Sequence, residues 1–201
     1  MTMRNTPLVV ARATAQDIET HLDAFADLLR DAVDGGASVG FLPPLAEETA
    51  LDYWLETSLA VRKRQVCLWV AHQEGTVHQE GTAHQEGTAH IVGSVQLHLA
   101  QKQNAFMRAE VAKLLVHRGF RRQGIATALM GRLEHHAASI ARTTLVLDTR
   151  AGDPANILYQ NLGYVEVGHI PAYAINTDGT PAATVLYYKL LEPTTQPIKP
   201  T

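Results

Sequence analysis

The basic segment from Arg121 to Ala126 (RRQGIA) has the residue types of a phosphate-binding turn. It follows an apolar stretch that ends at Val116 and precedes a predicted helix, whose first backbone N–H groups would point outward without partners. With the helix dipole, equivalent to about half a positive charge, such amides bind anions. Gly124 lacks the Cβ that would obstruct a phosphate, and Arg118 and the two arginines of the turn add positive charge. The segment therefore predicts an anion site; an ordinary strand-to-helix turn with solvated arginines is the alternative.

The helices and strands that would position this turn follow from the spacing of apolar residues. Strands are predicted at about 7–14, 65–71, 90–99, 107–116, 143–149, 164–167 and 183–190. Helices are predicted at about 15–33, 51–59, 123–141 and 154–161; in the second of these, Leu51, Leu55 and Leu59 share a side with Trp54. This order of elements predicts an α/β or α+β domain of three layers, with a mixed sheet and helices on both faces.

The size and composition of the chain are those of one soluble globular domain, which we place at residues 1–191, followed by a disordered tail at 192–201. The 201 residues are 46% hydrophobic and 18% charged. A formal net charge of −3 gives no broad attraction to nucleic acid or to an anionic membrane, so we expect neither partner. The single cysteine forms no internal disulfide, and no stretch approaches the roughly 20 apolar residues of a membrane-spanning helix. These features predict a cytoplasmic protein.

Residues 72–89 are three copies of a hexad, HQEGTV, HQEGTA and HQEGTA. Histidine is a common metal ligand, but a period of six matches neither a helix nor a strand, so nothing aligns the imidazole rings. We therefore predict no metal site, and we interpret the repeat as an insertion in a surface loop between two strands. Deletion of residues 78–89 is expected to leave folding and activity intact.

A second motif lies downstream, where residues 156–164 read NILYQNLGY. Together with R-x-x-G-x-A at residues 121–126, it resembles the paired motifs of the GNAT acetyltransferase superfamily. The resemblance implies a mixed, mostly antiparallel central sheet of about seven strands with helices on both faces. It also implies acetyl-CoA as the acyl donor and an amine as the acceptor. Residues 35–41, 101–104, 108–116 and 147–149 further resemble the tabtoxin-resistance acetyltransferases; the likeness departs at the hexads and at Arg122, where relatives often carry a small residue.

The resemblance assigns roles to individual residues. Tyr159 would protonate the departing CoA thiolate, and Glu110 and Asp148 would take the proton of the acceptor ammonium, because a lysine-like amine titrates near about 10.4. Structural pairing of these acids with Lys113, Arg108 or Arg150, and a core tyrosine bonded to a carbonyl, are the alternatives. The acceptor would contact a loop that includes Gly36, Ser38, Val39 and Phe41. The cofactor-binding residues would be Leu114, Leu115, Val116, Arg121, Arg122, Gln123, Gly124, Ile125, Ala126, Thr127, Asn156 and Tyr159.

The acceptor implied by the resemblance is a primary amine of a small molecule, such as a toxin or an antibiotic-like amino compound. Acetylation of protein termini or lysines, and a non-catalytic acyl-CoA-binding module, are the alternatives. Cys67 lies in an apolar strand without a base nearby in the sequence, so direct attack in a ternary complex is expected rather than an acyl-cysteine route. His117 and His169 are interpreted as loop histidines, with an acceptor-side or proton-relay role as the alternative. A monomer or a homodimer is expected.

Overall fold

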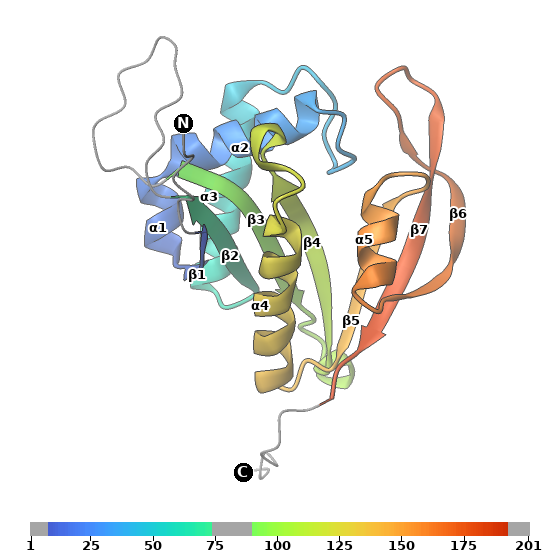
Figure 1. Cartoon of the computed structure of the whole chain (residues 1–201). Coiled ribbons are helices and arrows are strands. Elements are labelled where there is room, and N and C mark those ends of the chain that lie inside the picture. The colour runs from blue at the N-terminus through green and yellow to red at the C-terminus, as the bar shows by residue number, and fades with distance from the viewer. Residues whose placement is uncertain (1–7, 74–89, 193–201) are drawn as a thin grey trace, which may run out of the picture.

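The computed structural model describes residues 8–73 and 90–192, which form a seven-stranded mixed sheet between two helical layers (Figure 1). The strand order is β1-β2-β3-β4-β5-β7-β6. The strands are β1 (Leu8–Ala13), β2 (Val66–Gln73), β3 (His90–Leu99), β4 (Arg108–Val116), β5 (Thr144–Arg150), β6 (Val165–Ile175) and β7 (Pro181–Leu190). The helices are α1 (Ala15–Thr20), α2 (Leu22–Asp34), α3 (Glu47–Arg62), α4 (Ile125–Ser139) and α5 (Ala155–Asn161), with short 3₁₀ turns η1 (Gln103–Ala105) and η2 (Arg118–Phe120). The predicted fold class is confirmed.

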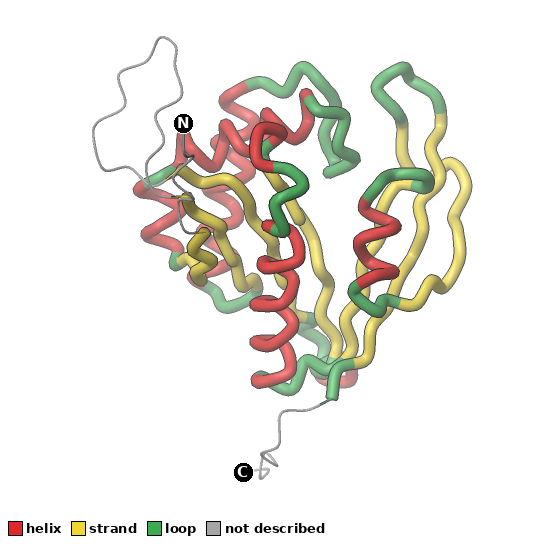
Figure 2. Tube along the Cα trace, viewed as in Figure 1, coloured by secondary structure: helices red, strands yellow, loops and turns green. Residues whose placement is uncertain are grey.

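Each face of the sheet packs against its own group of helices (Figure 2). On one face, Leu129 and Leu133 of α4 and Tyr159 of α5 form a core with strand residues such as Val111. On the other face, α1, α2 and α3 form a second core around Trp54. None of the described helices is long and apolar enough to cross a bilayer.

The predicted single helix at residues 15–33 is wrong, because the structure has two helices there. The first begins with a capping pair, in which the Thr14 hydroxyl accepts from the Asp17 N–H and the Asp17 carboxylate accepts from the Thr14 N–H. His21 then adopts φ −115° and ψ 32°, which ends α1 and lets α2 start in a new direction. Ile18 and Phe25, on either side of the break, are both buried as predicted.

The predicted inner face of α3 is also wrong in part. Trp54 is fully buried and its ring centroid lies 4.6 Å from that of Phe25 on α2. Leu55 and Leu59, however, are 41% and 52% exposed. Because burial of an aromatic side chain contributes more than burial of a leucine, the tryptophan sets the rotation of the helix and turns these leucines to solvent.

Strand β6 extends to Ile175, well beyond the predicted end at residue 167. It is an edge strand with most of its residues exposed on both faces, and its register against β7 shifts between Glu166 and Gly168 and between Ile170 and Ala174. Pro171 lies within the second shift, as expected for a residue that cannot donate a ladder hydrogen bond. The strand therefore lacks the regular alternation on which its prediction depended.

The hexad repeat begins within β2 rather than after it. His72 and Gln73 are the last residues of that strand, and Gln73 is the register partner of His90 at the start of β3. Residues 74–89, which hold most of the repeat, and residues 193–201 of the predicted tail lie outside the described part of the chain.

The pair β4–β5 positions the site, because these strands are parallel neighbours over only three register pairs. The last of these pairs is Glu110 with Val146. Beyond it β4 continues beside β3 and β5 beside β7, so the two halves of the sheet separate toward the top of Figure 1. Residues 111–116 of β4 and residues 147–150 of β5 therefore do not pair with each other, although the edges of the two strands face each other.

Candidate active site

The predicted anion-binding turn has a geometry that suits a phosphate. Arg122 and Gly124 both have positive φ, 62° and 79°, and Gly124 is the residue that precedes α4. The helix begins at Ile125 rather than at the predicted Gln123. Its first internal hydrogen bond runs from the Ala128 N–H to the Gly124 carbonyl at 3.0 Å, so the amides before residue 128 remain available. No described atom lies within 4 Å of the position that a Gly124 Cβ would take, so the approach to these amides is open.

The arginines around the turn do not share one role. Arg121 donates from Nε to the Val116 carbonyl at 3.3 Å, which places its guanidinium at the end of β4. Arg118 instead donates from Nε to the Asp31 carboxylate at 2.8 Å. Its charge is therefore paired with a carboxylate, which reduces the positive charge that Arg118 adds to the anion site.

A β-bulge shapes the part of β4 that faces the gap. Ser94 of β3 is opposite Leu115 and Gln96 is opposite Ala112, so Lys113 and Leu114 together face the single residue Val95. Lys113 has φ 49°, the backbone distortion that such a bulge produces. The segment that includes Leu114, Leu115 and Val116 thus combines an interrupted ladder on one side with an open edge on the other.

Tyr159 projects from α5 into the core and is 7% exposed. Its ring centroid lies 5.7 Å from that of Tyr164 and 6.0 Å from that of Tyr187. Burial raises the pKa of Tyr159 above its usual value, and the nearby negative charge of Asp148 raises it further. Within the described part of the chain its hydroxyl has no hydrogen-bond partner, so the phenol keeps its proton and no carbonyl accepts it.

Glu110 and Asp148 lie on the same face of the sheet, since Asp148 is two residues beyond the register partner of Glu110. Both residues are exposed. Asp148 accepts a hydrogen bond from the Thr184 hydroxyl at 2.9 Å. No described cation lies within ion-pair distance of either carboxylate, although their charges raise the pKa of Lys113, which burial lowers.

A polar cluster beside these acids was missed by the sequence interpretation. The Gln96 side-chain oxygen accepts from the Tyr53 hydroxyl at 3.0 Å and lies 2.8 Å from His98 Nε2. The Lys113 ammonium lies 5.4 Å from the centre of the Tyr53 ring. Burial, with a smaller contribution from the Lys113 charge, lowers the pKa of His98 and favours its neutral form. Polar residues at alternate positions of an otherwise apolar strand, Gln96 and His98, were the available signal.

The predicted acceptor loop lines a cavity of about 270 Å³. Gly36, Ser38 and Phe41 face it, together with Arg150 and with residues 174, 175 and 177 at the end of β6. Val39 does not line the cavity and packs on the helical core instead. Arg150 Nη2 donates to the Gly36 carbonyl at 2.9 Å, so the loop is fastened to the end of β5.

Asn156 is already engaged in the turn before α5. Its side-chain nitrogen donates to the carbonyls of Arg150 and Asp153 at 2.9 and 2.8 Å, and its oxygen accepts from the Tyr187 hydroxyl at 3.0 Å. Both amide protons are therefore used, and only the remaining lone pair of the oxygen is available to a ligand.

Cys67 is buried, as expected, but it is not isolated from basic side chains. Its sulfur lies 3.2 Å from Arg12 Nη2 and 3.8 Å from His136 Nε2. Burial raises the pKa of the Cys67 thiol despite the positive charges of Arg12 and Arg142. The histidine comes from α4, 69 positions away, so local sequence gave no sign of it.

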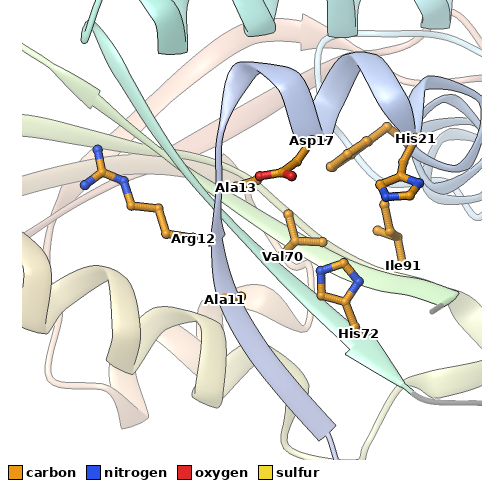
Figure 3. Close-up of a pocket in the computed structure, with 9 residues that line it drawn as sticks. Ala11, Arg12, Ala13, Asp17, His21, Val70, His72 and Ile91 are labelled. Carbon is orange, nitrogen blue, oxygen red and sulfur yellow. The ribbon is translucent and has the colours of Figure 1, made fainter. Parts of the chain in front are cut away.

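A second cavity of about 250 Å³ lies between β1, β2 and the first helices (Figure 3). Asp17, His21 and His72 contribute its polar atoms, whereas the Arg12 side chain points away from them. Burial lowers the pKa of His72. None of the predicted site residues lines this cavity. Among the described residues, no three histidine, cysteine or acidic side chains converge as metal ligands would.

Comparison with known proteins agrees with this geometry. Residues 64–166 match the model of the acetyltransferase (GNAT) domain. A candidate acetyltransferase from Acinetobacter baylyi superposes with a TM-score of 0.74 at 18% identity, with 98% of each chain covered. An N-acetyltransferase from Staphylococcus aureus gives 0.68 at 18% identity, over 92% of this chain and 99% of the other. A Salmonella typhimurium protein, solved with its cofactor acetyl-CoA, gives 0.68 at 14% identity, over 94% and 97%.

These solved structures share the fold, and the domain match covers half of the sequence. An open edge between diverging parallel strands, next to a small-residue turn at a helix start, defines the class of acyl-CoA-dependent N-acetyltransferases. The chain belongs to the GNAT acetyltransferase family.

Proposed function

We propose that this enzyme transfers the acetyl group of acetyl-CoA to a primary amine of a small molecule by direct attack in a ternary complex. The observation that carries the proposal is the separation of β4 from β5 after Glu110 and Val146. The anion-binding turn follows the end of β4, where Arg121 contacts the Val116 carbonyl, and Tyr159 would approach the open edge from α5. The two carboxylates Glu110 and Asp148 lie on the opposite face from the tyrosine-containing core.

The donor would bind along the open edge of β4. The amides of residues 124–127, with Arg121, Arg122 and Gln123 beside them, would hold the pyrophosphate. The backbone of Leu114 to Val116 would pair with the pantetheine arm, and an amide exposed at the bulge would polarise the thioester carbonyl. Asn156 would contribute at most one acceptor, because its other polar sites are used within the protein.

The reaction needs three proton transfers. Glu110 or Asp148, directly or through water, would take a proton from the acceptor ammonium, whose pKa near about 10.4 keeps it charged at neutral pH. The free amine would attack the thioester carbon, forming the C–N bond as the C–S bond breaks. The departing thiolate would take the proton of Tyr159, which burial keeps on the phenol. The second proton of the attacking nitrogen would then pass to the phenolate, directly or through water, which leaves a neutral amide, free CoA thiol and a restored Tyr159.

The acceptor side favours a small molecule. The cavity lined by Gly36, Ser38 and Phe41 has a volume of about 270 Å³, and Arg150 forms part of its wall. The resemblance of residues 35–41 and 147–149 to the tabtoxin resistance protein supports an amino-acid-like or β-lactam-containing acceptor. Independence from metals, a cytoplasmic location and a monomeric or homodimeric state remain predictions.

Release of free CoA thiol from acetyl-CoA, measured for a panel of acceptors, tests the proposal. The panel would contain small amines, amino-acid-like and tabtoxinine-like compounds, lysine-containing peptides and peptides with a free terminal alanine. We expect the highest kcat/KM for a small amine. Turnover of peptides alone would refute the acceptor class, and CoA binding without turnover of any acceptor would refute the catalytic assignment.

A further inference from the structure

The carboxylate of Asp31 holds the chain at the point where it leaves β4. Asp31 lies in the last turn of α2, and its side chain is 11% exposed. One oxygen accepts from the backbone N–H of Arg118 at 2.8 Å, and the other accepts from Arg118 Nε at 2.8 Å. The same carboxylate lies 3.5 Å from His117 Nε2. One acidic group thus fixes both residues that follow β4.

The segment held by Asp31 leads directly into the anion-binding turn. His117 Nδ1 accepts from the Gly119 N–H at 3.2 Å, and the Phe120 N–H donates to the His117 carbonyl at 2.9 Å. These bonds form η2, which ends one residue before Arg121. Any shift of residues 117 and 118 would therefore move Arg121 and the amides that follow it.

The end of α2 also touches the acceptor loop. A Cβ at Gly35 would lie 3.0 Å from Arg118 Cδ and 3.2 Å from Arg121 Nη2, so this glycine packs directly on both arginines. The next residue, Gly36, gives its carbonyl to Arg150. The loop that begins at Gly35 is consequently fixed by the anion-binding turn on one side and by β5 on the other.

We propose that Asp31 is a positioning residue for the cofactor: it sets the anion-binding turn through Arg118 and links that turn to the acceptor loop. The proposal rests on the proposed function, because it takes residues 121–127 as the pyrophosphate site. Arg118 is then a structural partner of Asp31 rather than a phosphate ligand.

A positioning role and a purely electrostatic effect predict opposite changes in CoA affinity when the carboxylate of Asp31 is removed. A carboxylate beside a pyrophosphate site repels the ligand, and its removal would also free Arg118 to bind phosphate. If charge alone mattered, Asp31→Asn would therefore tighten CoA binding. If Asp31 positions the turn, the same substitution weakens binding, because an asparagine amide can accept only one of the two hydrogen bonds from residue 118 and loses the ion pair.

Calorimetric titration with CoA distinguishes the positioning role of Asp31 from a purely electrostatic effect. We expect Asp31→Asn to raise the Kd for CoA about tenfold and to raise KM for acetyl-CoA with little change in kcat. Asp34→Asn is the matched control, because Asp34 lies on the same helix, acts on Arg118 only through its charge and is exposed. It should leave Kd within about threefold of the wild type. Equal or tighter binding by Asp31→Asn, as in the control, would overturn the proposal.

The variant Arg118→Gln provides a second test, in which Asp31 itself is unchanged. It should weaken CoA binding less than Asp31→Asn, because the backbone bond from residue 118 to Asp31 remains. The double variant should be no weaker than Asp31→Asn alone; additive losses would show that Arg118 binds phosphate independently and would refute the assignment. A wild-type enzyme that does not bind CoA would instead refute the proposed function, so the two failures are distinguishable.

Discussion

Replacement of Tyr159 by phenylalanine removes one hydroxyl and little else. The ring is held by Tyr164 and Tyr187, and its hydroxyl has no hydrogen-bond partner among the described residues. The substitution therefore leaves no donor or acceptor of the protein unsatisfied. We expect the free energy of unfolding to change by less than about 1 kcal/mol, so any large change in rate reports chemistry.

The expected loss of rate follows from the role of the proton. A positioned general acid contributes about 10²- to 10⁴-fold, which corresponds to roughly 3–5 kcal/mol of activation free energy. In the proposed complex the hydroxyl would lie at the reacting end of the cofactor rather than at the pyrophosphate, so CoA affinity should stay within about twofold. We thus expect kcat to fall at least a hundredfold while the Kd for CoA is unchanged.

The assay is thiol release at saturating acetyl-CoA and acceptor, combined with calorimetric titration of CoA. Tyr164→Phe is the matched control, because Tyr164 is also a buried tyrosine and its ring adjoins that of Tyr159. It should keep kcat within a few-fold. Comparable kcat for Tyr159→Phe and Tyr164→Phe would refute the assignment of Tyr159 as general acid.

The pH dependence gives a further check on the same residue. Burial raises the pKa of Tyr159 above its usual value of 10.0, so the folded enzyme holds this proton more tightly than the unfolded chain. Its contribution to stability is complete below pH 10 and is lost as the pH rises further. Between pH 7 and 9 the phenol stays protonated, and the rate should show no alkaline decline due to this group.

Three other outcomes are expected. Cys67→Ala should retain full turnover, and loss of activity in a folded Cys67→Ala enzyme would contradict direct attack. In the wild-type enzyme burial raises the pKa of the Cys67 thiol, so this thiol should react with iodoacetamide only after unfolding. Lys189 donates to Glu134 at 2.6 Å, and the two side chains are only 21% and 15% exposed. Lys189→Met should therefore lower the free energy of unfolding by about 3 kcal/mol, as measured by calorimetric melting. The double variant Lys189→Met, Glu134→Leu should recover most of this loss. Dialysis against EDTA should not change thiol release, and activity restored only by added metal would show that the prediction of no metal is wrong.

The sheet was predictable because each strand carries its own apolar pattern, whereas features set by packing across the molecule were not. The presence of seven strands and their sequence along the chain needed only local sequence. The rotation of α3 depends on Trp54 meeting Phe25 from another helix, so a regular leucine spacing misled the prediction. The end of β6 was missed because Pro171 interrupts its pattern.

In the candidate site too, local motifs were predictable from the sequence, whereas contacts between distant segments were not. The turn at residues 121–126 is contiguous, so its residue types were sufficient to predict a turn before α4, and the anion site at that turn remains a prediction. The pairing of Arg118 with Asp31 joins residues 87 positions apart, and no local pattern reveals it. The apolar neighbours of Glu110 and Asp148 along their strands give no sign that these acids are exposed, because those neighbours point to the other face. Burial at these positions depends on which helices cover the sheet.

Where β4 and β5 separate, each strand has one edge without a pairing strand. This open edge has a consequence for the lifetime of the enzyme. A pantetheine arm lying along the free edge of β4 would act as a partial extra strand and complete an interrupted sheet. Binding that occurs only in the folded state raises resistance to unfolding by mass action, by about 2.7 kcal/mol at a hundred times the Kd. The fraction of enzyme open to proteolysis would then fall as acetyl-CoA accumulates, so nutrient supply would govern how much enzyme persists as well as how fast it works.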